Sequence, residues 1–129
     1  MITAFHIDKV WPFVKDRLAI ICKEQEADFT PEDVYNDCLN GRAFLYTNDE
    51  DASFAVVKPV WNSYTNESSL FVMAAWGEGQ AQERHMEKLI ELAEGIGAKR
   101  IEMRSKRPGF QKTGWEMDYI AYSREVIHG

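Results

Sequence analysis

The chain has 129 residues, of which 45% are apolar and 28% charged, so its composition is that of a globular domain and not of a disordered segment. Its formal net charge of −6 argues against a general nucleic-acid binder, which needs a basic face. No run of about 18 apolar residues and no secretory signal occurs, so we expect a cytoplasmic protein with a single domain over residues 1–129.

The first segment predicts a short strand followed by an amphipathic helix. Weak alternation over Met1–His6 indicates the strand, and Asp8 is a suitable N-cap for a helix that begins at Lys9. Pro12 then falls in the first turn of this helix, where its missing N–H costs little.

A second helix is predicted to begin after Thr30, because threonine caps helices well and Pro31 suits the first helical position. Gly41 ends it with a residue that tolerates a positive φ. Cys22 and Cys38 lie on the apolar faces of the two helices, and the sequence has no CxxC pair or Cys/His cluster. We therefore expect buried thiols and no metal site.

Three strand candidates follow and are separated by polar turns, a pattern that indicates an antiparallel meander. They span Arg42–Thr47, Ala52–Trp61 and Ser69–Trp76. Pro59 lies late in the second of them, so this strand is expected to bend or to meet a sheet edge at that point.

A long amphipathic helix is predicted from Ala81 to about Gly95, followed by a strand over Ala98–Arg104. With the preceding strand they form a βαβ unit, whose right-handed crossover returns the chain beside its first strand. The glycine-bearing turn before the helix presents N–H groups at a helix N-terminus and is a candidate anion site. His85, near the start of this helix, is interpreted as a solvated or capping histidine, with a general base as the alternative.

The last segments are less regular. Lys106–Thr113 contains a Pro-Gly pair and hosts at most a short helical turn, and Trp115–Val126 suits one long strand or a tight hairpin. The order of elements predicts an α+β domain with a central mixed, mostly antiparallel sheet, flanked by helices and closed by one βαβ crossover.

Three stretches of the second half resemble the GNAT superfamily of acyl-CoA N-acyltransferases. They are the strand Val72–Trp76, the segment Met86–Ile101 with its Ala-x-x-x-Gly spacing, and the glycine–aromatic frame of Gly109–Glu116. The first half matches the family in the order of its elements alone.

The resemblance implies an N-acetyltransferase that moves the acetyl group of acetyl-CoA to an unidentified amine by direct transfer in a ternary complex. The main chain of Val72 and Ala74 would contact the pantetheine where two strands splay apart, and a main-chain N–H there would hold the oxyanion. The diphosphate would lie on the next loop and helix start, which consist of Gly77, Glu78, Gly79, Gln80, Ala81 and Gln82.

Further site residues are candidates by position. Glu67 and Glu102 are candidate bases acting through a water, or else are solvated carboxylates. Trp61 and Tyr64 either line the acceptor cleft or belong to the core or rim. The basic run Arg104–Lys112 either meets the 3′-phosphate of coenzyme A or is solvated surface. The acceptor is expected to be a small-molecule or protein amine, with no membrane partner; whether the chain forms a homodimer stays open.

Two alternatives remain. The loop Gly77–Gln82 displaces the glycines that family members commonly carry, and Phe110 stands where many members have a proton-donating tyrosine. These features favour a non-catalytic binding or structural protein of the same fold. A nucleic-acid-associated module rests only on the basic patch and is the weaker alternative.

Overall fold

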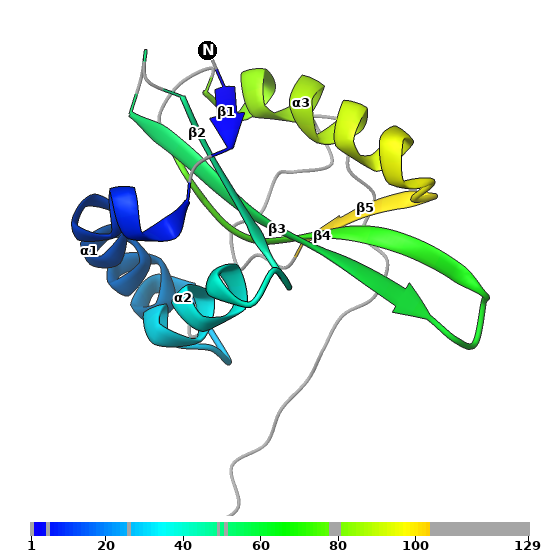
Figure 1. Ribbon diagram of the computed structural model, residues 1–129, viewed down its shortest axis with the longest axis horizontal. Coiled ribbons are helices and arrows are strands. Elements are labelled where there is room, and N and C mark those ends of the chain that lie inside the picture. The colour runs from blue at the N-terminus through cyan, green and yellow to red at the C-terminus, as the bar shows by residue number, and fades with distance from the viewer. Residues whose placement is uncertain are drawn as a thin grey trace, which may run out of the picture.

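The computed structural model describes residues 2–4, 6–25, 27–48, 50, 52–77 and 81–103 (Figure 1). Its elements are β1 (Ile2–Ala4), α1 (Ile7–Gln25), α2 (Pro31–Leu39), β2 (Phe44–Asn48), β3 (Ser53–Asn62), β4 (Glu67–Trp76), α3 (Ala81–Ile96) and β5 (Arg100–Met103). This order confirms the predicted sequence of elements up to residue 103. The predictions for Lys106–Thr113 and Trp115–Val126 lie outside the described residues.

The described strands form one mixed sheet in the order β1-β2-β3-β4-β5. The pairs β1–β2, β2–β3 and β3–β4 are antiparallel and the pair β4–β5 is parallel, which confirms the mostly antiparallel sheet with one crossover. Helices α1 and α2 lie on one face and α3 on the other (Figure 1). Among the described helices, none is both long and apolar enough to cross a membrane.

Helix α1 begins at Ile7 and not at Lys9 as predicted, because His6 takes the capping role expected of Asp8. The Nδ1 atom of His6 accepts the Asp8 N–H at 3.3 Å, and its carbonyl accepts the Lys9 N–H at 3.1 Å. Pro12 consequently lies beyond the first turn, inside the helix. At this position proline has no N–H to donate, so one helical hydrogen bond is missing.

The start of α2 agrees with its prediction in detail. The Thr30 hydroxyl accepts the Asp33 N–H at 3.2 Å, and the Asp33 carboxylate accepts the Thr30 N–H at 2.9 Å. This reciprocal capping box satisfies two of the donors that every helix N-terminus leaves open.

The end of α3 explains the Ala-x-x-x-Gly spacing. Gly97 has φ +73° and donates its N–H to the Glu94 carbonyl at 3.2 Å, while Ala98 donates to the Ala93 carbonyl at 2.8 Å. These two hydrogen bonds form a Schellman motif, in which the residue at the glycine position needs a left-handed backbone. The spacing therefore encodes a helix stop that delivers the chain to β5.

Strand β3 has a buried first half and an exposed second half. Ser53 to Val57 are all buried because β2 and β4 flank them and helices cover both faces. The β2 register ends at the Phe44–Val57 pair, so Pro59 lies where the β2 side of β3 has no partner among the described strands. This position confirms the edge expected for Pro59. Beyond it, the β3–β4 hairpin extends away from the body of the domain (Figure 1).

Candidate functional site

Strand β4 contains a β-bulge in its second half. Val57 pairs with Val72 and Val56 pairs with Ala74, so Met73 is an extra residue without a partner in the β3 register. The bulge also changes which face the side chains occupy. Leu70 and Val72 pack in the cluster beneath α3, whereas Ala74 and Trp76 pack in the cluster beneath α1.

Strand β4 also pairs in parallel with β5, as far as the last described residue of β5. This pairing runs from the Ser69–Arg100 pair to the Val72–Met103 pair, and β4 then continues to Trp76. The β-bulge at Met73 interrupts the ladder with β3 one residue beyond Val72. Main-chain groups around Val72 and Ala74, the predicted pantetheine contacts, therefore lie at the point where the regular hydrogen-bond ladder is interrupted.

Helix α3 begins shortly after β4 and points its N-terminus to this end of the sheet (Figure 1). Of the predicted diphosphate residues, Gly77 follows β4 directly, and Ala81 and Gln82 form the first turn of α3. The first N–H groups of a helix have no helical acceptor, so this turn can receive an anion. The intervening residues Glu78, Gly79 and Gln80 lie outside the described part of the chain.

His85 is buried, with 6% of its surface exposed, which contradicts its interpretation as a solvated or capping residue. Its Nε2 atom lies 2.8 Å from the Ser53 hydroxyl, which is buried at the start of β3. The reason is helical periodicity: His85, Leu89 and Ala93 are spaced at i, i+4 and i+8, and all three face the sheet. The contact anchors the first half of α3 against β3.

Trp76, the last residue of β4, lies beside α1. The guanidinium carbon of Arg17 is 3.7 Å from the centroid of the Phe13 ring and 5.9 Å from that of the Trp76 ring. Arg17 also donates a hydrogen bond to the Phe13 carbonyl at 2.9 Å. Phe13 in turn packs edge-on against Phe54 of β3, with 6.3 Å between ring centroids. A cation is thus held at the end of the strand that precedes the candidate anion site.

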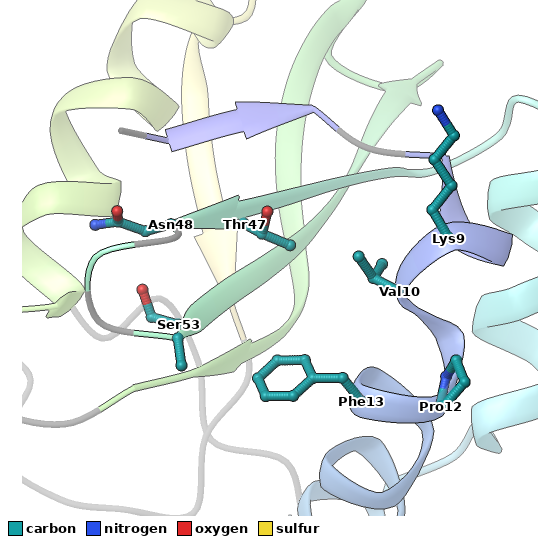
Figure 2. Close-up of a pocket in the computed structure, with 8 residues that line it drawn as sticks. Lys9, Val10, Pro12, Phe13, Thr47, Asn48 and Ser53 are labelled. Atoms are coloured by element: carbon teal, nitrogen blue, oxygen red, sulfur yellow. The ribbon is translucent and has the colours of Figure 1, made fainter.

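A pocket of about 450 Å³ lies between α1 and the β2–β3 connection (Figure 2). It is lined by Lys9, Val10, Pro12, Phe13, Thr47, Asn48, Ala52 and Ser53. None of these lining residues comes from β4 or β5, so the pocket is separate from the strand interruption at Met73. Sequence reasoning did not identify it, because its walls come from two segments that are distant in the chain.

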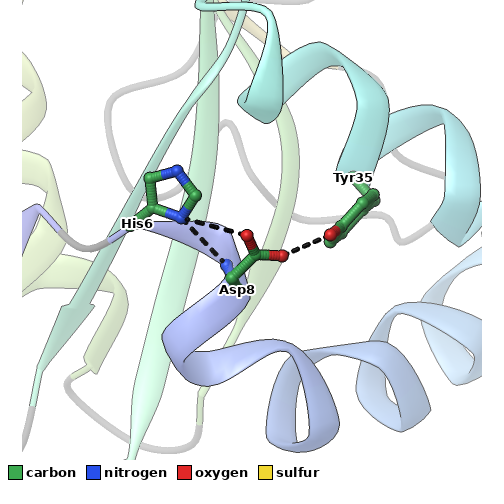
Figure 3. Close-up of polar contacts among 3 residues, drawn as sticks. All are labelled: His6, Asp8 and Tyr35. Atoms are coloured by element: carbon green, nitrogen blue, oxygen red, sulfur yellow. Dashed lines mark hydrogen bonds and ion pairs between the residues drawn. The ribbon is translucent and has the colours of Figure 1, made fainter.

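A polar cluster ties the start of α1 to α2 (Figure 3). The Tyr35 hydroxyl donates to the Asp8 carboxylate, whose second oxygen lies 3.6 Å from the Nδ1 atom of His6. The hydrogen bond to Asp8 raises the pKa of the Tyr35 phenol, because it stabilises the protonated form. Trp11 packs on the Tyr35 ring with 4.8 Å between centroids. The cluster sets how the two helices lie side by side.

The two candidate bases occupy different places on the sheet. Glu102 lies on β5 opposite Phe71, and its carboxylate is 3.4 Å from the Ser69 hydroxyl and 3.7 Å from the Arg100 guanidinium. Glu67 is the first residue of β4 and lies about 20 Å along the strand from Met73. Glu102 is therefore the candidate closer to the strand interruption.

Trp61 and Tyr64 lie at the tip of the β3–β4 hairpin, where 59% and 97% of their surfaces are exposed. The structure does not bring them together with Met73 or with α3. Among the described residues, no cluster of His, Cys, Asp and Glu could hold a metal ion. The basic run Arg104–Lys112 lies outside the described residues.

Solved structures with the same architecture align with almost the whole chain. A predicted acetyltransferase from Clostridium acetobutylicum with acetyl-CoA has a TM-score of 0.70 at 14% identity, over 95% of each chain. A protein described as a probable acetyltransferase has a TM-score of 0.67 at 10% identity, over 100% of this chain and 99% of the other. Ribosomal-protein-alanine N-acetyltransferase from Brucella melitensis biovar Abortus has a TM-score of 0.61 at 11% identity, over 98% and 99%.

These similarities establish the fold: the chain has the same architecture as these acetyltransferase structures. No protein-family profile and no curated protein matches the sequence. The fold implied by the resemblance of Val72–Trp76 and of the Ala93–Gly97 helix stop is therefore confirmed.

Proposed function

We propose that this protein transfers the acetyl group of acetyl-CoA to an amine by direct attack in a ternary complex. The proposal treats residues 1–129 as one catalytic domain and takes a small-molecule or protein amine as acceptor. It is supported by the fold and by the acetyl-CoA held in a structural neighbour.

One observation carries the proposal: a β-bulge at Met73 interrupts the pairing of β4 with β3. A strand that is fully paired on both edges has no main-chain group to offer a ligand. At the bulge, by contrast, Val72 and Ala74 flank Met73, which has no partner in the β3 register. Pantetheine, which carries two amide groups, suits such a segment, and the start of α3 suits the diphosphate.

The reaction needs few side chains. The amine nitrogen forms a bond to the acetyl carbon while the carbon–sulfur bond breaks, so the amine must lose a proton and the thiolate must gain one. In this proposal Glu102 takes the amine proton through a water, and the contacts from Ser69 and Arg100 hold its carboxylate on β5. A main-chain N–H near the bulge would stabilise the negative charge on the carbonyl oxygen.

Calorimetry and thermal unfolding with acetyl-CoA test the proposal. We expect saturable binding, a higher melting temperature and, with a panel of amines, release of a thiol that a colorimetric reagent detects. Absence of both heat and thermal shift at millimolar acetyl-CoA would refute acyl-donor use. That result would favour the alternative of a non-catalytic protein of the same fold, which the unusual loop Gly77–Gln82 also suggests.

A further inference from the structure

Helix α2 ends on an asparagine–glycine pair, Asn40–Gly41, which is exposed to solvent. In such a pair the main-chain nitrogen of the glycine can attack the side-chain carbonyl carbon of the asparagine, because glycine has no side chain to obstruct the approach. A C–N bond forms, and the amide nitrogen of Asn40 leaves as ammonia together with the proton that Gly41 loses. Water then opens the resulting succinimide ring at either carbonyl and leaves aspartate or isoaspartate.

A Schellman motif holds the nitrogen that would attack. The Gly41 N–H donates to the Cys38 carbonyl at 3.3 Å, and the Arg42 N–H donates to the Asp37 carbonyl at 2.8 Å. Gly41 has the left-handed φ, of +71°, that this motif requires. An ion pair of 3.0 Å between the Arg42 guanidinium and the Asp37 carboxylate joins the same two residues through their side chains. The attacking nitrogen is therefore engaged as a donor in the folded helix end.

The Asn40 side chain is held apart from that nitrogen. Its Nδ2 atom donates to the Asn36 carbonyl at 2.7 Å, the same carbonyl that accepts the Asn40 N–H at 3.0 Å. The ψ angle of Asn40 is 8°, so the Gly41 nitrogen eclipses the Asn40 nitrogen and points away from the Asn40 Cβ atom. Ring closure needs that nitrogen in contact with the side-chain carbonyl carbon. The end of α2 must consequently open before the reaction can occur.

The product cannot restore this helix end. A carboxylate in place of the Asn40 amide has no N–H to donate to the Asn36 carbonyl, and its negative charge lies at the negative end of the helix dipole. The Asp37 carboxylate, three residues earlier on the helix, adds repulsion. Isoaspartate also lengthens the main chain by one carbon just before Gly41, where the Schellman motif needs its register.

We propose that Asn40 is a deamidation site controlled by the end of α2. The closed Schellman motif protects it, local opening of α2 lets it react, and the product keeps the helix end open. This inference does not depend on acyl transfer. It assigns to Asn40 a one-way chemical change that records how often the end of α2 opens.

The first test follows deamidation of the full chain at pH 8 by peptide mapping with mass spectrometry, and urea-unfolded protein provides the reference. We expect Asn40 to react at least about tenfold more slowly in the folded protein, because the reaction waits for local opening. Equal rates in folded and unfolded protein would overturn the protection by the Schellman motif.

Two substitutions at the exposed Asn36 separate opening of the helix from the intrinsic chemistry. Asn36→Gly weakens the helix and Asn36→Ala strengthens it, and both keep the main-chain carbonyl and the Asn40–Gly41 pair. Deamidation should be about fivefold faster in Asn36→Gly than in Asn36→Ala, which is the expected ratio of their opening equilibria. Asn62, which precedes Ser63 after β3, is the internal control and should react equally in both. Equal Asn40 rates in the two variants would mean that the reaction does not wait for α2 to open.

Asn40→Asp tests the effect of the product. In hydrogen exchange followed by NMR, the Gly41 and Arg42 amides should exchange about fivefold faster than in the parent, because the helix end loses one hydrogen bond and gains a repulsive charge. The Lys99 amide, which donates to the Ser68 carbonyl far from α2, should not change. Unchanged exchange at Gly41 and Arg42 would overturn the inference that the product keeps the helix end open.

Discussion

Single residues at the end of the sheet combine packing with polar contacts. His85 illustrates this: its ring is buried beneath α3 and contacts the Ser53 hydroxyl. A buried polar group is tolerated only when its hydrogen bonds are made, so the pair links α3 to β3 more specifically than apolar contacts would.

Replacing His85 with alanine should lower the free energy of unfolding by about 2–4 kcal/mol, because it leaves a cavity and deprives the buried Ser53 hydroxyl of this contact. Urea denaturation measures the effect. Glu87→Ala, an exposed change on the same helix, should stay within about 0.5 kcal/mol. Similar costs for the two variants would show that His85 is not held as the structure indicates.

The cysteines, predicted to be buried, are both partly buried thiols without a disulfide. Burial, with a smaller contribution from the Asp37 carboxylate, raises the pKa of Cys38 to about 11 from 9.0. The thiolate is the reactive form, so Cys38 should react with iodoacetamide at pH 8 about 100-fold more slowly than an ordinary thiol.

Peptide mapping by mass spectrometry over time measures this rate for Cys38, and urea-unfolded protein provides the reference. Since the folded pKa is raised, the protonated thiol favours the native state below pH 9, and this contribution is lost as the pH rises through about 11. Equal alkylation rates in folded and unfolded protein would contradict the burial of Cys38.

At the scale of elements, helix ends and a bulge position the site. The Schellman motif at Gly97 stops α3 so that Lys99 can donate to the Ser68 carbonyl at 2.9 Å and β5 can pair beside β4. The bulge at Met73 turns the end of β4 toward α1, which brings Trp76 to Arg17. The Schellman motif and the bulge each change the direction of the chain at one residue, and so determine what the following residues contact.

Two glycines at the end of α3, Gly95 inside the helix and Gly97 just after it, should respond oppositely to alanine. An added Cβ meets no atom within 4 Å at either Gly95 or Gly97, but Gly97 alone has a positive φ, of +73°. Gly97→Ala should therefore destabilise by about 1 kcal/mol, whereas Gly95→Ala should stabilise by about 0.5–1 kcal/mol because it restricts the unfolded chain. Thermal and urea unfolding of both variants check the opposite signs, and changes of the same sign would exclude the Schellman assignment.

At the scale of the whole molecule, helices cover the sheet on both faces, whereas the β3–β4 hairpin beyond Val57 is exposed. The two core clusters lie on opposite faces of the same strands, and β2, β3 and β4 each contribute residues to both. Beyond Val57, β3 is no longer paired with β2, and its residues become exposed. Stability should accordingly be uneven along a single strand.

Hydrogen exchange followed by mass spectrometry should show this gradient. Amides of Ser53–Val57 are expected to exchange only on global unfolding, whereas amides of Lys58–Asn62 should exchange by local opening of the hairpin, at least about 100-fold faster. Trp61→Ser at the exposed tip serves as the control and should leave the protection of Ser53–Val57 unchanged. Uniform protection along β3 would mean that the hairpin is covered in solution.

Hydrophobic periodicity and the positions of glycine, proline and capping residues determined the order of elements, the N-cap at Thr30, the bend or edge at Pro59 and the Ala93–Gly97 helix stop. These features depend on neighbours within a few residues. Only the tertiary structure decided the burial of His85, the bulge at Met73, the pocket beside α1 and the placement of Arg17 against Trp76. Each of these depends on which strand or helix a residue meets across the fold, and no local pattern of residues specifies that partner.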